Sequence, residues 1–378
     1  MSLTFEEHLE RQDSQKIYLA EIELAYMDQG SVATEMIYLS DQSIDPHLTD
    51  IFYEPKLEGV PMFRRSMQEI VFGRSSSAFG NLTVINADGG LDDLLHTRQW
   101  EGRTITIKLG FDGLATNQFR PVFTGRMGRP SWDFQKVTIP IQDYQTDCLR
   151  KVHPEYDGAD TLDNLLGAAL GHAGISSIDL TMRSAWATEN AFTAYLVTDG
   201  YESVATVLDR IISLVGGWWG FDRDGTFIIG TFKEPSGQAD LTITDLDLLP
   251  SGFSEKIFDR HYWKVNVGYY SNAPETRATA TQEDPIVQDF NPLAMEMGTR
   301  ETILNTEADA DTIKTRLFAL YSAPRRVLTV KTKVRPLLLR LHSTVALELD
   351  RHGQHGLFRL IGFSEDYKNS EITMELWA

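Results

Sequence analysis

The sequence predicts a mainly β protein with two related antiparallel β-barrel domains and an inserted small α+β domain. Segments that alternate apolar and polar residues, as half-buried strands do, gather toward both ends of the chain, whereas helical periodicity is concentrated in the middle. The 378 residues are enough for two to four domains with well-buried cores. The predicted domains are residues 1–150, a first barrel with a long loop insertion; 151–240, the α+β domain; and 241–378, a second barrel with one helix.

The first barrel is predicted from short strands separated by turn signals. Strands are expected at residues 16–26, 36–39, 80–86, 102–109, 121–124 and 136–142. The first two can pair across a Gly-containing turn, and the third ends in Asx-Gly chemistry that makes turns. Residues 41–78 contain several X-Pro steps and a serine cluster, which indicate a long loop with short strands. Pro140 should lie at a sheet edge or a bulge, because it has no N–H to donate.

Two amphipathic helices define the middle domain. Apolar residues fall on one helical face in residues 161–170, with Thr161 as a plausible cap, and again in residues 201–215, which end at a Gly-Gly pair. Residues 218–229 read as strand, Asp-Gly turn and strand. In the last third, strands are predicted at residues 262–269, 326–332, 344–349, 357–361 and 371–377, with one helix at residues 307–321.

Residues 104–139 and 344–374 share one plan. Each has a strand, a Gly-containing turn, a strand that ends near a glycine, an acidic turn and a third strand. If the likeness is real, the chain carries two similar barrels, and three copies could form a ring of six similar units without open edges. The alternative is that each stretch independently has the ordinary sequence pattern of a β-meander.

Charge and composition narrow the functional classes. The chain has 35 Lys and Arg and 54 Asp and Glu, a net charge of −19. This balance argues against a protein that grips phosphate backbones, but DNA could still pass it without binding; solubility alone is the alternative explanation. Apolar runs such as residues 211–215 are far shorter than the roughly 20 residues that span a bilayer. The amino terminus lacks a secretion-signal pattern, so assembly in a cytoplasm-like compartment is expected.

The sequence does not strongly support any residue as catalytic, cofactor-binding or metal-binding. The single cysteine, Cys148, can form neither an internal disulfide nor a thiolate cluster, and is expected in a core. His352 and His355 could bind a metal, but a turn between strands explains them better. Asp222–Gly225 has the beginning of a calcium loop without its closing acid, so a hairpin turn is the better interpretation.

Paired acids and clustered aromatics are the remaining candidates. Asp92 with Asp93, or Asp143 with Asp147, could be the carboxylates of a glycosidase, although solvated turns and helix starts explain them equally well. A sugar-binding shelf could be formed by Trp218, Trp219, Tyr262, Trp263, Tyr269 and Tyr270. Packing in a core or a subunit interface is the commoner role of strand aromatics.

Several segments, in their joint order along the chain, resemble a family of siphophage minor tail or tail-hub proteins. These are Tyr53–Leu57, Gly80–Asp92, Trp100–Arg103, Val215–Gly225, Val265–Tyr269 and Leu357–Trp377. The resemblance implies a tail-hub type of fold with two related barrels, ring assembly, no enzymatic residues and no cofactor. Some tail-tip hubs hold an iron–sulfur cluster through several cysteines, which a chain with Cys148 alone cannot do.

The resemblance also implies a place and partners in the virion. We expect a baseplate hub ring, three copies or alternatively six, assembled in the host cytoplasm and located at the phage tail tip. Its neighbours would be a distal tail protein, a tail tube or tape-measure protein, and a central fibre or spike, with DNA passing through the lumen. The alternatives are a hexameric distal tail ring, a tail-associated cell-wall-degrading enzyme and a carbohydrate-binding module.

Overall fold

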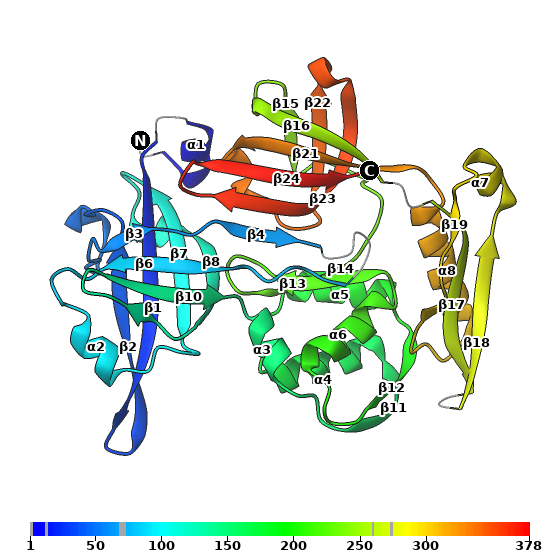
Figure 1. Ribbon diagram of the computed structural model, residues 1–378, viewed down its shortest axis with the longest axis horizontal. Helices are drawn as coiled ribbons and strands as arrows, with labels where there is room; N and C mark the ends of the chain where they lie inside the picture. Colours follow the sequence, from blue (N-terminus) through cyan, green and yellow to red (C-terminus); the bar gives the residue numbers. More distant parts are fainter. Residues whose placement is uncertain (1–2, 12–13, 68–72, 259–260, 273–274) are drawn as a thin grey trace.

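The structure, a computed structural model, describes residues 3–11, 14–67, 73–258, 261–272 and 275–378. The chain forms four parts (Figure 1). A nearly closed barrel and a curled sheet lie beside each other, a helical part lies below them, and a sheet covered by a helix stands at the far end from the barrel. The amino-terminal region and the first barrel are drawn in blue to green, and strands β21 to β24 of the curled sheet in orange and red.

The first barrel is an eight-stranded antiparallel sheet ordered β2-β1-β7-β8-β10-β6-β3, with β9 beside β10. Its strands are β1 (Lys16–Asp28), β2 (Ser31–Ser40), β3 (Leu57–Gly59), β6 (Phe79–Ile85), β7 (Thr104–Phe111), β8 (Arg120–Met127), β9 (Ser131–Trp132) and β10 (Lys136–Gln142). Short helices α1 (Phe5–Glu10), η1 (Pro46–Leu48), α2 (Asp92–Thr97) and η2 (Thr116–Gln118) flank them. All six predicted strands of this region are therefore present.

The first barrel nearly closes because the segment before β3 returns to β2. The Glu54 N–H donates to the Tyr38 carbonyl at 2.9 Å, and the Ser40 N–H donates to the Glu54 carbonyl at 2.8 Å. Inward-facing residues such as Ile105 and Ile107 are fully buried, so alternation fills the barrel with apolar side chains. Pro140 lies in the interior strand β10 and not at an outer edge of the sheet. On one side of β10, β9 pairs with residues 137–138 and β8 pairs with residues 141–142, so Pro140 falls between the two pairings.

The second β part is a seven-stranded sheet ordered β15-β22-β23-β24-β21-β16, with β4 beside β23. Its strands are β4 (Phe63–Ser66), β15 (Leu241–Thr244), β16 (Leu248–Phe258), β21 (Arg325–Lys333), β22 (Thr344–Leu349), β23 (Gln354–Asp366) and β24 (Glu371–Trp377), with the short helices η3 (Arg335–Leu338) and η4 (Asp350–His352). Strands β22, β23 and β24 form an antiparallel meander, as β7, β8 and β10 do in the first barrel. The strand plan that the sequence repeats is thus present twice.

The prediction of a second closed barrel needs correction, because this sheet curls into a half-barrel. Only residues 245–247 separate β15 from β16, the two end strands of the sheet. Following the pairings from strand to strand, β15 and β16 run in the same sense. Neighbouring strands of the same sense need a crossover of a dozen or more residues. The two strands therefore follow one another along the chain without pairing, and the sheet stays open.

Residues 57–85 contribute strands to three sheets in succession. After β3 in the barrel, β4 pairs antiparallel with β23 of the half-barrel, with Arg65 opposite Phe363. β5 (Gly73–Arg74) then pairs parallel with β13 in the helical part, and β6 returns to the barrel. What the sequence predicts as a loop insertion of the first domain is a connector that joins three parts (Figure 1).

The helical part combines four helices with two small sheets. It contains α3 (Gln145–Arg150), β11 (Tyr156–Thr161), α4 (Leu162–Ala173), α5 (Leu180–Glu189), β12 (Thr193–Thr198), α6 (Val204–Ser213), β13 (Gly217–Phe221) and β14 (Phe227–Thr231). The two predicted helices are α4 and α6, and Thr161 caps α4 by accepting from the Asn164 N–H at 3.3 Å. The predicted Asp-Gly turn joins β13 to β14, with Gly225 at a φ of 79°.

The fourth part is a sheet covered by one long helix. It consists of β17 (Tyr262–Asn272), β18 (Thr276–Glu283), α7 (Pro285–Phe290), β19 (Met295–Glu296), β20 (Arg300–Glu301) and α8 (Glu307–Tyr321). The predicted helix coincides with α8, whose buried residues include Ile313 and Leu317. Within the described ranges, no helix has the length and hydropathy that crossing a membrane requires. The domain boundaries derived from the sequence remain predictions.

Candidate functional site

The four candidate acids occupy structural positions. Asp92 and Asp93 are exposed in the first turn of α2, where the helix N-terminus favours negative charge. Asp147 pairs with Arg126 at 3.0 Å. Asp143 is buried and accepts hydrogen bonds from the Ser77 hydroxyl and the Ala78 N–H, both at 2.7 Å. These contacts give the acids local roles in helix starts and connections.

The candidate metal ligands also have local partners. His352 stacks on Phe253 with ring centroids 4.3 Å apart, and His355 lies 3.5 Å from Asp350. In Asp222–Gly225, the Asp222 N–H donates to the Thr226 carbonyl and the Gly225 N–H to the Asp222 carbonyl, which makes a hairpin turn. Among the residues that the structure describes, no group of three or more His, Cys, Asp or Glu side chains is arranged to hold a metal ion.

The structure does not bring the candidate aromatics together as a shelf. Trp218 and Trp219 are fully buried in β13, in the helical part. The tyrosines and Trp263 belong to β17, in the fourth part. Packing accounts for the tryptophans: the Trp219 indole N–H donates to Asp209 at 2.8 Å, and its ring stacks on Phe227 at 5.8 Å.

Cys148 is a core residue, as the sequence predicts. Its side chain is fully buried. Burial, helped by the negative charges of Asp147 and Asp143, raises the pKa of the thiol to about 12. Since the thiolate is the nucleophilic form, the group is inert at neutral pH.

The most unusual group of side chains is a buried charge junction, which we define as Arg65, Asp179, Asp222, Arg223, Arg340 and Glu365. They come from β4, the N-cap of α5, the β13–β14 turn, the segment after η3 and the end of β23. These elements belong to the connector, the helical part and the half-barrel. Three carboxylates and three guanidinium groups meet there, so the formal charges balance.

Glu365 is the centre of this junction. Its side chain is 0% exposed, yet it contacts two arginines. Arg65 Nη1 lies 3.2 Å from Glu365 Oε2, and Arg223 Nε and Nη2 lie 2.7 and 2.6 Å from Glu365 Oε1. Arg223 also donates from Nη1 to the Leu339 carbonyl at 2.6 Å. Both guanidinium groups lie over the Phe363 ring, at 6.0 Å for Arg65 and 4.7 Å for Arg223.

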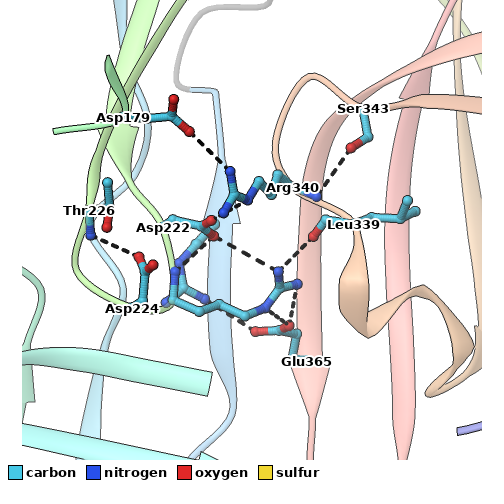
Figure 2. Close-up of polar contacts among 10 residues, drawn as sticks. Asp179, Asp222, Asp224, Thr226, Leu339, Arg340, Ser343 and Glu365 are labelled. Carbon is cyan, nitrogen blue, oxygen red and sulfur yellow. Dashed lines mark hydrogen bonds and ion pairs between the residues drawn. The ribbon is translucent and has the colours of Figure 1, made fainter. Parts of the chain in front are cut away.

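Arg340 closes the junction on its more exposed side. Figure 2 shows Arg340 reaching across from the half-barrel to Asp179 and Asp222 of the helical part. Arg340 Nε lies 2.6 Å from Asp222 Oδ2, and its Nη1 lies 3.2 Å from Asp179 Oδ2. The Arg340 backbone N–H is held by the Ser343 hydroxyl oxygen at 3.2 Å.

Electrostatics keep the junction charged. Burial acts to lower the pKa of Arg223, but the negative charges of Glu365 and Asp222 outweigh it, and the pKa is raised. Burial and the nearby Glu365 raise the pKa of the Tyr367 hydroxyl well above its ordinary value. Removing one partner from such a buried pair typically costs about 3–5 kcal/mol, because the other charge is left without compensation. The arrangement therefore acts as a specific clamp between parts of the chain.

An aromatic seam, defined as Tyr18, Phe63, Phe123 and Tyr367, lies beside the junction. The Phe63 ring stacks on Phe123 of the barrel with centroids 4.6 Å apart. Tyr367 of the half-barrel contacts Tyr18 edge to face at 5.8 Å, and the Tyr18 hydroxyl donates to the Tyr367 carbonyl at 3.3 Å. The two β parts are thus joined by apolar packing as well as by charge.

No pattern in the sequence indicates this junction as a unit. Arg223 stands inside the Asp222–Gly225 turn that the sequence singles out for calcium, and Arg65 lies in the predicted loop. The segment Phe63-Arg64-Arg65-Ser66 does not alternate apolar and polar residues, so periodicity does not mark it as a strand. Finding the partner Glu365, 300 residues further along, requires the tertiary structure.

Comparison with solved structures identifies the architecture. A tail protein from Neisseria meningitidis MC58 matches with a TM-score of 0.54 and 13% identity, covering 96% of this chain and 97% of that chain. The 43 kDa tail protein of prophage MuSo2 from Shewanella oneidensis matches with a TM-score of 0.50 and 14% identity, covering 96% of both chains. Prophage tail protein gp18 from Listeria monocytogenes EGD-e has a TM-score of 0.50 and 13% identity, covering 94% of both.

This chain has the fold of prophage tail proteins. The likeness extends over nearly the whole length of all three tail proteins, so it includes the fourth part as well as the two β parts. No protein-family model matches the sequence, and no curated protein matches it. The tail-protein fold that the sequence resemblance implies is therefore confirmed, except that the second of its two barrels is an open half-barrel.

Proposed function

We propose that this chain is a non-enzymatic structural component of a bacteriophage tail, the subunit of a baseplate hub ring at the tail tip. The observation that carries this proposal is the full-length likeness to three tail proteins, two of them from prophages. The two β parts with the same three-strand meander support the ring. In it, three copies present six similar units around an axis, and the ring joins the tail tube or distal tail ring to a central fibre or spike.

The buried charge junction suits this mechanical role. A ring subunit has to hold its barrel and half-barrel in one orientation, since a rotation of one would misplace the neighbouring copy. Glu365 binds the connector and the helical part to the half-barrel through Arg65 and Arg223. Such networks specify one arrangement because any other leaves charges buried and unpaired.

The proposed lumen is acidic, so that DNA passes without binding. The net charge of −19 supplies an excess of carboxylates that would repel phosphates. Asp and Glu side chains are expected to outnumber Lys and Arg on the surface that faces the channel. A density map of the ring with a basic channel would contradict this part of the proposal.

Electron microscopy of phage tails tests the hub. Labelling the chain with a carboxy-terminal tag and averaging tail tips should place the label in a threefold annulus below the tail tube. A sixfold ring with six labels per tail would instead support the distal tail ring, and a label elsewhere in the particle would contradict both.

A cell-wall assay tests the enzymatic alternative. Purified protein on a zymogram of host cell wall should produce no clearing. If clearing occurs and Asp92→Ala, Asp93→Ala or Asp143→Ala abolishes it without lowering the thermal stability of the protein, the non-enzymatic proposal is wrong.

A further inference from the structure

Two cavities of the half-barrel meet at one exposed leucine. Leu246, between β15 and β16, is 97% exposed. It lines a cavity of about 790 Å³ between the barrel and the half-barrel, and a second of about 640 Å³ over β15 and β22. One exposed apolar side chain does not by itself mark an interface, so the case for a partner depends on the charges of the two cavities that Leu246 separates.

The first cavity is a basic cleft, which we define by Lys16, Lys333, Arg335 and Lys368 in its lining. Arg335 is neutralised by Asp247 at 3.0 Å, and Lys333 lies 3.6 Å from Glu371. Within the described residues, no ion pair compensates the positive charge of Lys16 or Lys368. The Lys16 Nζ is buried and makes no hydrogen bond within the described chain. Lys368 is exposed in the β23–β24 turn, and none of the ion pairs found among the described residues involves it.

Glu10 and Asp247 also line the cleft, but both lie against Arg335, and neither forms an ion pair with Lys16 within the described residues. Burial, with the positive charge of Lys333, lowers the pKa of Lys16 to about 8. Buried amino groups are almost always hydrogen-bonded, so a buried one without an acceptor needs an explanation. A carboxylate that entered the cleft would supply it, and the flexible lysine stem has no existing hydrogen bond to lose when it turns toward that carboxylate.

The second cavity is an acidic groove, defined by Asp245, Glu348 and Asp350 in its lining. Asp245 Oδ2 accepts from the Arg351 N–H at 3.2 Å, while its Oδ1 is buried without a hydrogen-bond partner in the described residues. Glu348 is exposed on β22 and takes part in none of the ion pairs identified in the described ranges. The acidic groove therefore carries the negative charge that would pair with Lys16 and Lys368 of the basic cleft.

We infer that the basic cleft of one copy of this chain receives the acidic groove of a second copy, and that Leu246 is buried in the contact. A small free anion would compensate the lysines but would leave Leu246 exposed and the acidic groove unused. A second copy satisfies all three features at once, since every copy carries both charges beside the same leucine. Complementary potentials of this kind set register and suppress wrong pairings. This inference rests on the proposed assembly of several copies into a ring.

Charge reversal tests the contact in the full-length purified protein. Sedimentation velocity over a concentration series gives the dissociation constant of the copies. Lys368→Glu and Glu348→Lys should each raise it at least tenfold, and the chain with both substitutions should recover most of that loss. Lys256→Glu is the matched control, because Lys256 is an exposed lysine on β16 of the same half-barrel, outside both cavities.

The result also separates this contact from the proposed hub. All three positions are exposed, so equal thermal unfolding of the variants shows that folding is intact. A wild-type chain that stays monomeric, or reversals that act no more strongly than Lys256→Glu, would overturn the inference. If the tail tip shows the annulus while the reversals have no effect on association, the hub stands and this contact is wrong. If the reversals behave as expected but the label lies outside the tail tip, the contact stands and the hub fails.

Discussion

The barrel and the half-barrel use the same three-strand meander but are completed in different ways. In the barrel, β7, β8 and β10 belong to a sheet that nearly returns on itself, and its interior is filled by residues such as Ile105 and Ile107. In the half-barrel, β22, β23 and β24 belong to an open sheet that receives β4 from the connector. The comparison indicates that a shared local plan fixes the strands, whereas closure depends on what the rest of the chain supplies.

The difference extends to the forces that hold each part. The barrel is held mainly by apolar burial, which is non-directional and tolerates small changes. The half-barrel carries Glu365 at its centre with two buried arginines from other parts. Its attachment should therefore be sensitive to single polar substitutions that the barrel would tolerate.

The largest effect is expected at Glu365. Glu365→Gln keeps the shape of the side chain but leaves Arg65 and Arg223 buried without a counter-charge, so the free energy of unfolding should fall by about 3–5 kcal/mol. Urea unfolding measures this loss. Glu375→Gln is the matched control, since Glu375 pairs with exposed Arg64 at 2.9 Å, and exposed pairs contribute about 1 kcal/mol or less. Equal losses in the two variants would show that the junction is not a clamp.

A smaller effect is expected where the connector meets the helical part. At Gly220 on β13, an added Cβ would lie 2.2 Å from Ser75 Oγ, so Gly220→Ala should overpack the contact and cost about 1–3 kcal/mol. Adding Ser75→Gly should restore most of the stability, because the clashing side chain is removed. A double variant that is as unstable as Gly220→Ala alone would contradict this close approach of the connector.

Acid should weaken the half-barrel through His342. Burial, with the positive charges of Arg359 and Lys233, lowers the pKa of His342 from 6.5 to about 3. The folded state therefore resists protonation that the unfolded chain accepts, so this stability is complete above pH 6.5 and is lost as the pH falls toward 3. At pH 5.5 the loss is about 1.4 kcal/mol.

Unfolding in urea between pH 7 and pH 5 measures this dependence. His342 has a φ of 71°, a conformation that asparagine tolerates, so His342→Asn removes the titrating ring without backbone strain. The variant should have a flatter stability profile than the wild type. Since the difference between the two profiles isolates His342, other groups such as His153 do not obscure it. Parallel profiles would show that His342 does not contribute.

The smallest perturbation is chemical labelling of Cys148, which lies in α3 of the helical part. With the pKa of the thiol raised to about 12, only about one molecule in 10⁴ carries a thiolate at pH 8. A thiol reagent such as Ellman's should therefore react only on unfolding, in step with the loss of secondary structure. Rapid reaction in the native protein would show that the helical part opens locally although the charge junction is intact.

Local structure was largely predictable from the sequence. Strands β10, β22 and β24 and helix α8 have the bounds that their residue patterns indicate. These elements have clear periodicity and strong end signals, and their residues need only near neighbours to adopt the conformation. The hairpin turn at Asp222–Gly225 was predictable for the same reason, because Asp-Gly chemistry is local.

The candidate site was not predictable in the same way. Sequence patterns indicated Asp143, Trp218 and Trp219 as candidate site residues, whereas the structure buries all three in structural positions. The sequence predicts a long loop with short strands in the connector but not the sheets that these strands join, because β4 and β5 have only four and two residues, too few for periodicity to be read. Arginine and glutamate carry no mark in a sequence that distinguishes a buried ion pair from a solvated one.

The sequence by itself determined most strands of the two β parts, the helices α4, α6 and α8, the repeated meander and the excess of negative charge, because each depends on short-range pattern or on composition. Only the tertiary structure decided that the second sheet stays open, that the connector visits three sheets, and that Glu365 meets Arg65 and Arg223. The physical reason is that closure, strand exchange and charge pairing depend on which distant segments share one buried volume. Burial is a property of the whole chain and of no single segment of it.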